Sequence, residues 1–123
     1  MTVLLAVALG GALGAMGRFA VSSWSNQKFR HSPIGTLAVN LTGALALGIF
    51  LALGDAHVDL SPGAYRFIVT GVLGSYTTFS TMFYETFTLI ETEKPTLAMI
   101  YATGSMVAGV LAVFLGMALV GIL

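Results

Sequence analysis

The sequence predicts an all-α integral membrane protein with four transmembrane helices, the third of which is broken near its middle. Three observations lead to this prediction. Hydrophobic residues make up 57% of the 123 residues and charged residues only 8%, whereas soluble domains carry about 25% charged residues. Four apolar stretches reach the roughly 20 residues that a membrane-spanning helix needs. One stretch contains a dense run of glycine and hydroxyl residues, Gly71–Thr81.

The composition excludes several other classes of protein. The mean hydropathy is +0.95, the formal net charge is +0, and no basic tail suggests a nucleic-acid partner. The chain has no cysteine, which rules out disulfides and thiolate chemistry. No nucleophile–base pair or metal-ligand cluster is evident, so we expect no enzyme activity. The N-terminal apolar run lacks a preceding positive charge and is too long for a signal-peptide core, so we interpret it as a retained span.

The predicted spans form a single domain over residues 1–123. They cover about residues 2–24, 34–54, 64–90 and 96–122, with the break near 71–78. Each connector ends in or near a proline (Pro33, Pro62, Pro95), which favours the first turn of the next helix. The basic residues fall mostly on one side, which favours an outside N-terminus. Arg18 lies within a span and Lys94 lies beside acidic residues, so both a fixed and a dual topology stay open.

Small residues recur every four positions along three of the spans. The sets are Ala6, Gly10 and Gly14; Ala44, Gly48 and Ala52; and Gly104, Ala108, Ala112 and Gly116. This spacing places each set on one helix face, where it lets two backbones approach closely. The pattern leaves open whether these faces join helices within one chain or between chains. Four short helices leave little interior for a permeation path, so we expect an oligomer.

Two polar residues, Thr36 and Asn40, continue the small-residue face of the second span. The amide of Asn40 offers two hydrogen-bond donors and one acceptor to the protein interior. Taken alone, such an amide is more typical of a hydrogen bond between helices than of a ligand site.

The third span favours a functional interpretation. Gly71 and Gly74 weaken the helix, and six hydroxyl residues lie between Ser75 and Thr81. An unwound turn exposes carbonyl oxygens that suit a hard cation such as Na⁺, and the restarted helix presents N–H groups that suit an anion. The positive ring edge of Phe79, within this run, also suits an anion. The competing interpretation is a glycine kink with hydroxyls bonded back to carbonyls; the density of glycine and hydroxyl groups favours the break.

Arg18 and Glu85 are the two ionisable residues clearly inside the predicted spans. Charges within a membrane usually face a cavity or a partner. Arg18 is expected either to reach the membrane interface or to attract anions at a pore mouth. Glu85 is expected to pair with Arg18 or to relay protons. A pairing or structural role is the first interpretation for both.

Three ordered motifs now indicate a family. They are GGALGAMGRF (Gly10–Phe19), GTLAVN (Gly35–Asn40) and GVLGSYTTFST (Gly71–Thr81). With them the chain resembles the Fluc (CrcB) family of bacterial fluoride channels over essentially its full length. The resemblance implies an antiparallel dimer with two pores in the bacterial plasma (inner) membrane. It also implies passive fluoride export that lowers intracellular fluoride toxicity, and a structural Na⁺ at the dimer centre that is not transported.

The resemblance further implies roles for individual residues. The backbone carbonyls of Gly74 and Thr77 match the Na⁺ ligands. The positions that match the fluoride path are Asn40, Phe79, Ser80 and Thr81, with Thr36 nearby. Arg18 and Glu85 match the charged positions of the family.

Two positions depart from the family pattern. Family members often carry a second pore phenylalanine three residues after the first, where this chain has Met82. The fourth span has Gly109 at the position expected for a pore-facing serine, with Ser105 and Tyr101 as candidate substitutes. Together with the charge bias, these departures add a second possible partner to the homodimer in dual topology, namely a homologous but different subunit.

Two other functions stay open at this point. The first is a small proton-coupled multidrug exporter in which Glu85 exchanges protons for an organic cation. The dense hydroxyl run and the lack of a wide aromatic pocket argue against it. The second is a non-transporting assembly subunit, which would show no ion flux without a partner.

Overall fold

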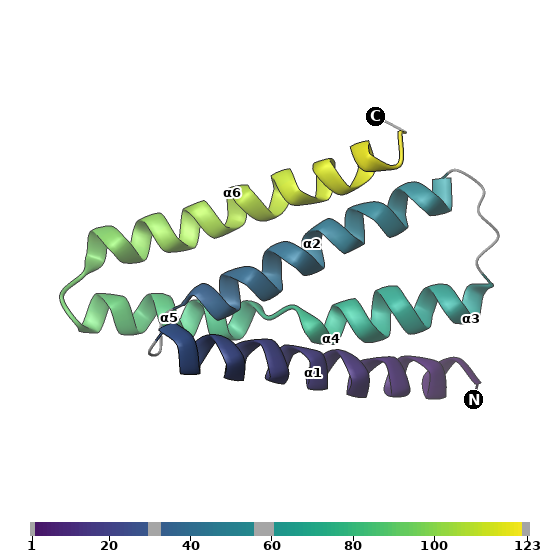
Figure 1. Ribbon diagram of the computed structural model, residues 1–123, viewed down its shortest axis with the longest axis horizontal. Coiled ribbons are helices and arrows are strands. Elements are labelled where there is room, and N and C mark those ends of the chain that lie inside the picture. The colour runs from purple at the N-terminus through teal and green to yellow at the C-terminus, as the bar shows by residue number, and fades with distance from the viewer. Residues whose placement is uncertain (1, 30–32, 56–60, 122–123) are drawn as a thin grey trace.

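The computed structural model describes residues 2–29, 33–55 and 61–121, and all regular elements in these ranges are helical. Long helices run side by side with an interrupted helical segment (Figure 1). The bounds are α1 Thr2–Phe29, α2 Ile34–Asp55, α3 Pro62–Tyr65, the π-helix η1 Arg66–Leu73, α4 Gly74–Tyr76, α5 Phe79–Glu91 and α6 Pro95–Leu119. The predicted end of the fourth span, at residue 122, lies outside the described residues.

Three helices in the described ranges are long and apolar enough to cross a membrane, namely Val3–Phe29, Ile34–Gly54 and Pro95–Leu119. The interrupted segment, α3 to α5, lies alongside them over a comparable length (Figure 1). The chain is therefore a multi-pass membrane protein. The prediction of an all-helical membrane fold is confirmed, and the third predicted span is interrupted, as the sequence predicted.

The interrupted segment changes its helical form along its length. It begins at Pro62, where the hydroxyl of Ser61 accepts a hydrogen bond from Ala64 N–H at 3.2 Å. It then continues as the π-helix η1, a rare form often found at functional sites. Thr77 (φ −72°, ψ 156°) and Thr78 (φ −146°, ψ 119°) are extended, and α5 begins directly afterwards. The helix is thus interrupted over two residues.

Glycines allow α1 to pack directly on the backbone of η1. A Cβ atom on Gly10 would overlap the carbonyl oxygen of Phe67, and one on Gly14 would overlap that of Val72. Such close approach supports Cα–H···O contacts between helices. In lipid, where no hydrophobic force drives helices together, this packing holds α1 against the interrupted segment.

The same device joins α2 to α6, which pack side by side. A Cβ on Gly48 would overlap the carbonyl oxygen of Val113, and one on Gly116 would overlap that of Leu45. No neighbouring atom lies within 4 Å of the Cβ position of Gly104. At these positions the small-residue faces therefore join helices within the chain, whereas Gly104 faces open space.

The buried interior is small, and the outer faces are apolar. Val39 and Ala52 on α2 are 0% exposed, whereas Leu4 on α1 and Met99 on α6 are 75% and 70% exposed. Large apolar side chains exposed in this way suit contact with lipid tails. Polar contacts between elements are therefore confined to the inner faces, where α2 meets the third segment and where α5 meets α6.

Gly14→Ala is expected to destabilise the protein by about 1–3 kcal/mol, because the added methyl group forces α1 away from η1. Gly11→Ala is the matched control, since nothing lies within 4 Å of the Cβ position of Gly11. Thermal unfolding of the purified protein in detergent measures both effects. Equal melting temperatures for the two variants would contradict the packing described here.

Candidate functional site

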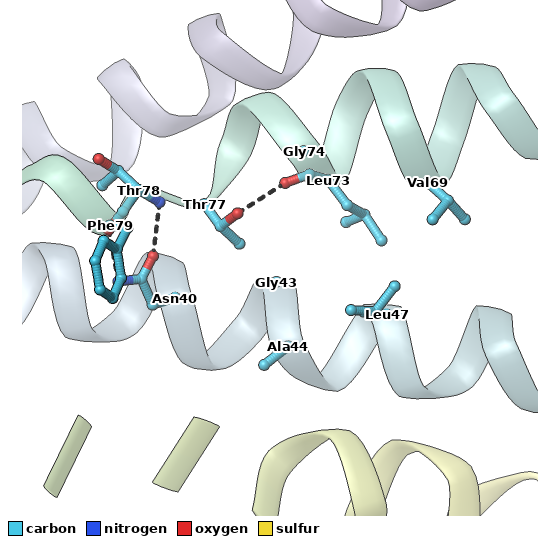
Figure 2. Close-up of a pocket in the computed structure, with 10 residues that line it drawn as sticks. All are labelled: Asn40, Gly43, Ala44, Leu47, Val69, Leu73, Gly74, Thr77, Thr78 and Phe79. Atoms are coloured by element: carbon cyan, nitrogen blue, oxygen red, sulfur yellow. Dashed lines mark hydrogen bonds between the residues drawn. The ribbon is translucent and has the colours of Figure 1, made fainter. Parts of the chain in front are cut away.

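The side chain of Asn40 holds the break in the third segment. Its Nδ2 donates to the carbonyl oxygen of Thr78 at 2.9 Å, and its Oδ1 accepts from Thr78 N–H at 2.8 Å. Figure 2 shows Asn40 reaching from α2 to the extended backbone. The amide thus pairs with Thr78 as a neighbouring β-strand would. Both backbone groups of Thr78 are satisfied without water, as the membrane interior requires.

Hydroxyl groups complete the hydrogen bonding around the break. The Oγ1 of Thr78 accepts from Thr81 N–H at 3.2 Å, so Thr78 is the N-cap of α5. The same oxygen donates to Thr81 Oγ1 at 3.0 Å. The hydroxyl of Thr77 donates to the carbonyl oxygen of Leu73 at 3.1 Å. The Thr78 hydroxyl therefore replaces a helical partner that the break removes, whereas the Thr77 hydroxyl is a second donor to Leu73 C=O, which still accepts from Thr77 N–H at 3.1 Å.

These substitutions affect two carbonyl groups. In an unbroken α-helix, Gly74 C=O would accept from Thr78 N–H, and Thr77 C=O would accept from Thr81 N–H. Here Thr78 N–H bonds to Asn40 and Thr81 N–H bonds to the Thr78 hydroxyl. The two carbonyls that match the predicted Na⁺ ligands have therefore lost their helical donors. Carbonyl oxygens are suitable ligands for a hard cation.

A groove of about 330 Å³ runs along the break, between α2 and the third segment (Figure 2). It is lined by Asn40, Gly43, Ala44, Leu47, Val69, Leu73, Gly74, Thr77, Thr78 and Phe79. No acceptor among the described residues meets the second N–H of the Asn40 amide. The groove therefore offers one amide donor on a mostly apolar wall. No group of three or more acidic or histidine side chains in the described ranges could hold a metal ion.

A second polar cluster joins three helices. Thr36 Oγ1 on α2 donates to Glu85 Oε1 at 2.8 Å, and Tyr101 OH on α6 donates to Glu85 Oε2 at 2.6 Å. Arg18 forms no ion pair with Glu85, although the structure describes both residues. The pairing of Arg18 with Glu85 considered from the sequence is therefore wrong: two hydroxyl donors hold the carboxylate instead.

Three further hydroxyl residues lie near these clusters. Ser105, one turn after Tyr101 on α6, is only 9% exposed, and its Oγ has no hydrogen-bond partner in the described structure. Ser80 and Thr81 are exposed in the first turn of α5. A buried hydroxyl without a partner is costly. Ser105 is thus one of two buried hydroxyls without a partner in the described residues; the other is Ser25 on α1.

Two aromatic residues of α5, Phe79 and Phe83, share one exposed face. The rings of Phe79 and Phe83 pack with centroids 4.5 Å apart and an interplanar angle of 45°. Met82 is 3% exposed and lies inside the chain. Phe79 lines the groove beside Asn40, whereas Met82 does not (Figure 2). Met82, which stands where family members often carry a second phenylalanine, therefore does not share the exposed face of Phe79.

Sequence reasoning did not include Thr78 or Thr42 among the site residues. Thr78 carries a local signal, because a threonine directly before a restarting helix is a typical N-cap. Thr42 has no such signal. Its hydroxyl lies 3.1 Å from the hydroxyl of Tyr76, 34 positions away in the chain.

Comparison with known proteins identifies the family. The sequence profile described as CrcB-like protein, Camphor Resistance (CrcB), matches residues 5–117. The chain belongs to the CrcB family. The resemblance drawn from the three motifs is thus confirmed.

Relatives of the CrcB chain carry a common name. A protein of Acidobacterium capsulatum is 46% identical over 112 residues, 90% of each chain. A protein of Chloroflexus aurantiacus is 41% identical over 120 residues, 97% of this chain and 95% of its own. A protein of Aquifex aeolicus is 42% identical over 117 residues, 94% of each chain. All three are named fluoride-specific ion channel FluC.

Removing a hydroxyl from the Glu85 cluster of this CrcB-family chain is expected to lower its stability. Tyr101→Phe should lower the free energy of unfolding by about 0.6 kcal/mol, the average for a hydrogen bond between membrane helices, and by at most about 1.7 kcal/mol. Tyr84→Phe is the control, because Tyr84 is 72% exposed and its hydroxyl makes no hydrogen bond to a described residue. Denaturant unfolding in detergent measures the difference. If both variants unfold alike, the Tyr101–Glu85 bond does not contribute.

Proposed function

We propose that this chain forms a fluoride-selective channel that exports cytoplasmic fluoride passively and so lowers its toxicity. The proposal rests on one observation above all: relatives over 40% identical across nearly the whole chain are named fluoride-specific ion channels. An ion channel is not an enzyme, which agrees with the prediction from composition. The proposed location is the bacterial plasma (inner) membrane.

The hydrogen-bond donors around the break support this function. Fluoride is small and strongly hydrated, so a selective path must replace its water with donors. Asn40 keeps one N–H for this task, and Ser105 keeps its hydroxyl. Ser80 and Thr81 lie exposed at the start of α5. The edge of Phe79 adds a weakly positive surface in the groove.

The hydroxyls of Thr36 and Tyr101 are less accessible donors. Both point their hydrogens to the carboxylate of Glu85. In the proposed path they can bind fluoride only after Glu85 releases them. We place Arg18, half-buried on α1, at the mouth of the path, where its positive charge attracts anions. Met82, which is buried away from the groove, would support the wall rather than contact the ion.

The proposal includes a structural Na⁺ that is not transported. Gly74 and Thr77 would hold it through backbone carbonyls, since both line the groove and both have lost their helical donors. The cation would lower the repulsion that an anion meets within a narrow path.

A second subunit would complete the path. The groove is open, and Phe79 is 61% exposed although it lines a site at the middle of a membrane segment. We propose an antiparallel dimer, either of two copies of this chain in dual topology or of this chain with a homologous subunit. The remaining outer surface would contact membrane lipid.

Proteoliposomes that contain the purified chain and a fluoride gradient should release fluoride passively. Fluoride release should be much faster than chloride release, because the same hydrogen-bond donors stabilise chloride less. An ion-selective electrode measures both fluxes. Absent efflux, or equal efflux of the two halides, would contradict the channel proposal.

Asn40→Asp is expected to stop fluoride conduction. The substitution replaces an N–H donor by a negative charge, which repels both fluoride and the Thr78 carbonyl oxygen. Gln27→Glu is the control, since it also converts an amide to a carboxylate but at an exposed position near the end of α1. The same efflux assay measures both variants. Normal flux through Asn40→Asp channels would remove Asn40 from the path.

A further inference from the structure

A second contact, in addition to that of Asn40, ties the third segment to α2. The hydroxyls of Tyr76 and Thr42 lie 3.1 Å apart. Tyr76 is the last residue of α4, immediately before the two extended residues of the break. Thr42 lies on α2, two positions after Asn40. Asn40 holds the downstream side of the break, and Tyr76 holds the upstream side.

The direction of this hydrogen bond follows from the other partners of Thr42. Its hydroxyl carries one hydrogen, which it donates to the carbonyl oxygen of Ala38 at 2.7 Å. Tyr76 O–H is therefore the donor to Thr42 Oγ1. The result is a short chain of hydrogen bonds from Tyr76 through Thr42 to the backbone of α2. Such a chain leaves neither hydroxyl hydrogen unsatisfied in the membrane.

Gly43 makes room for this arrangement, and Gly17 lies beside it at ordinary contact distance. A Cβ on Gly17 of α1 would lie 3.5 Å from the Tyr76 ring, and one on Gly43 of α2 would lie 3.3 Å from it. The Cβ position of Gly43 also overlaps the side chain of Thr77. The ring of Tyr76 thus fits between α1 and α2. At the break, the side chain of Thr77 therefore packs directly against the backbone of α2 at Gly43.

We propose that Tyr76 and Thr42 form a positioning pair that fixes the upstream side of the break on α2. Asn40 and Thr42 lie two residues apart on a helix and so point to different faces. Together with the contact at Gly43, the hydrogen bonds of Asn40 and Thr42 hold the third segment against two faces of α2. The geometry of the Gly74–Thr78 backbone is then set by α2 rather than by the segment itself. The effect on ion flux rests on the fluoride path proposed above.

Hydrogen exchange of the third segment tests this pair without any need for ion flux. Tyr76→Phe and Thr42→Val each remove the bond, while the ring of Tyr76 and the shape of Thr42 are largely kept. Each variant should raise amide exchange within Gly74–Thr81 about threefold, the factor expected for an average hydrogen bond between membrane helices. The double variant should exchange no faster than either single variant, because both changes remove the same bond. Mass spectrometry of the protein in lipid nanodiscs measures the exchange.

Two matched variants separate this role from general effects of losing a hydroxyl. Thr42→Ser keeps the hydroxyl and should exchange like the unmodified protein. Thr103→Val removes an exposed hydroxyl on α6 that bonds only to its own helix, at Met99 O, and should leave the third segment unchanged. Exchange in Tyr76→Phe or Thr42→Val equal to that in Thr103→Val would overturn the proposal. Additive effects in the double variant would also overturn it.

Fluoride efflux from proteoliposomes gives a second, separate readout. Tyr76→Phe and Thr42→Val should lower the ratio of fluoride to chloride flux by similar factors, and Thr42→Ser should not. If the unmodified chain carries no fluoride, the channel proposal fails while the exchange result still decides the positioning pair. If the chain carries fluoride and the variants keep both normal selectivity and normal exchange, the positioning pair fails and the channel proposal stands.

Discussion

The membrane interior offers no water to a peptide group that leaves a helix, so every such group must find a partner within the protein. The third segment is extended at Thr77 and Thr78, so its backbone groups need partners from the protein. Asn40 supplies both a donor and an acceptor to Thr78, and the Thr78 hydroxyl supplies an acceptor to Thr81 N–H. The hydroxyl-rich sequence and a single amide on α2 thereby make a break possible within lipid.

The same change of hydrogen-bond partners leaves free acceptors and a free donor at the break, among the described residues. Because Thr78 N–H and Thr81 N–H bond to side chains, the carbonyls of Gly74 and Thr77 lose their helical donors. Acceptors for a cation are thus present on the backbone, while Asn40 keeps a donor for an anion. A site with both kinds of group, lined by an otherwise apolar groove, is consistent with the ion-channel names of the relatives.

Close packing of the helix backbones limits the places where polar side chains can meet. Gly14 brings α1 against η1, and Gly48 brings α2 against α6, while the outer faces of α1 and α6 remain apolar. Polar side chains inside the bundle therefore have few positions in which to meet. The carboxylate of Glu85 illustrates this restriction, because its two hydrogen bonds join α5 to both α2 and α6.

The membrane class, the helical fold, the region of the break and the motifs of the CrcB family could all be predicted from the amino-acid sequence. These depend on hydropathy and residue type, which are local properties. Which polar groups meet could not be predicted and was seen first in the folded chain. Asn40 bonds to Thr78, 38 residues away, Glu85 bonds to hydroxyls rather than to Arg18, and Met82 turns inward. The physical reason is that these partners come from different helices, and residue patterns along each helix do not fix which helices become neighbours or how they are shifted along one another.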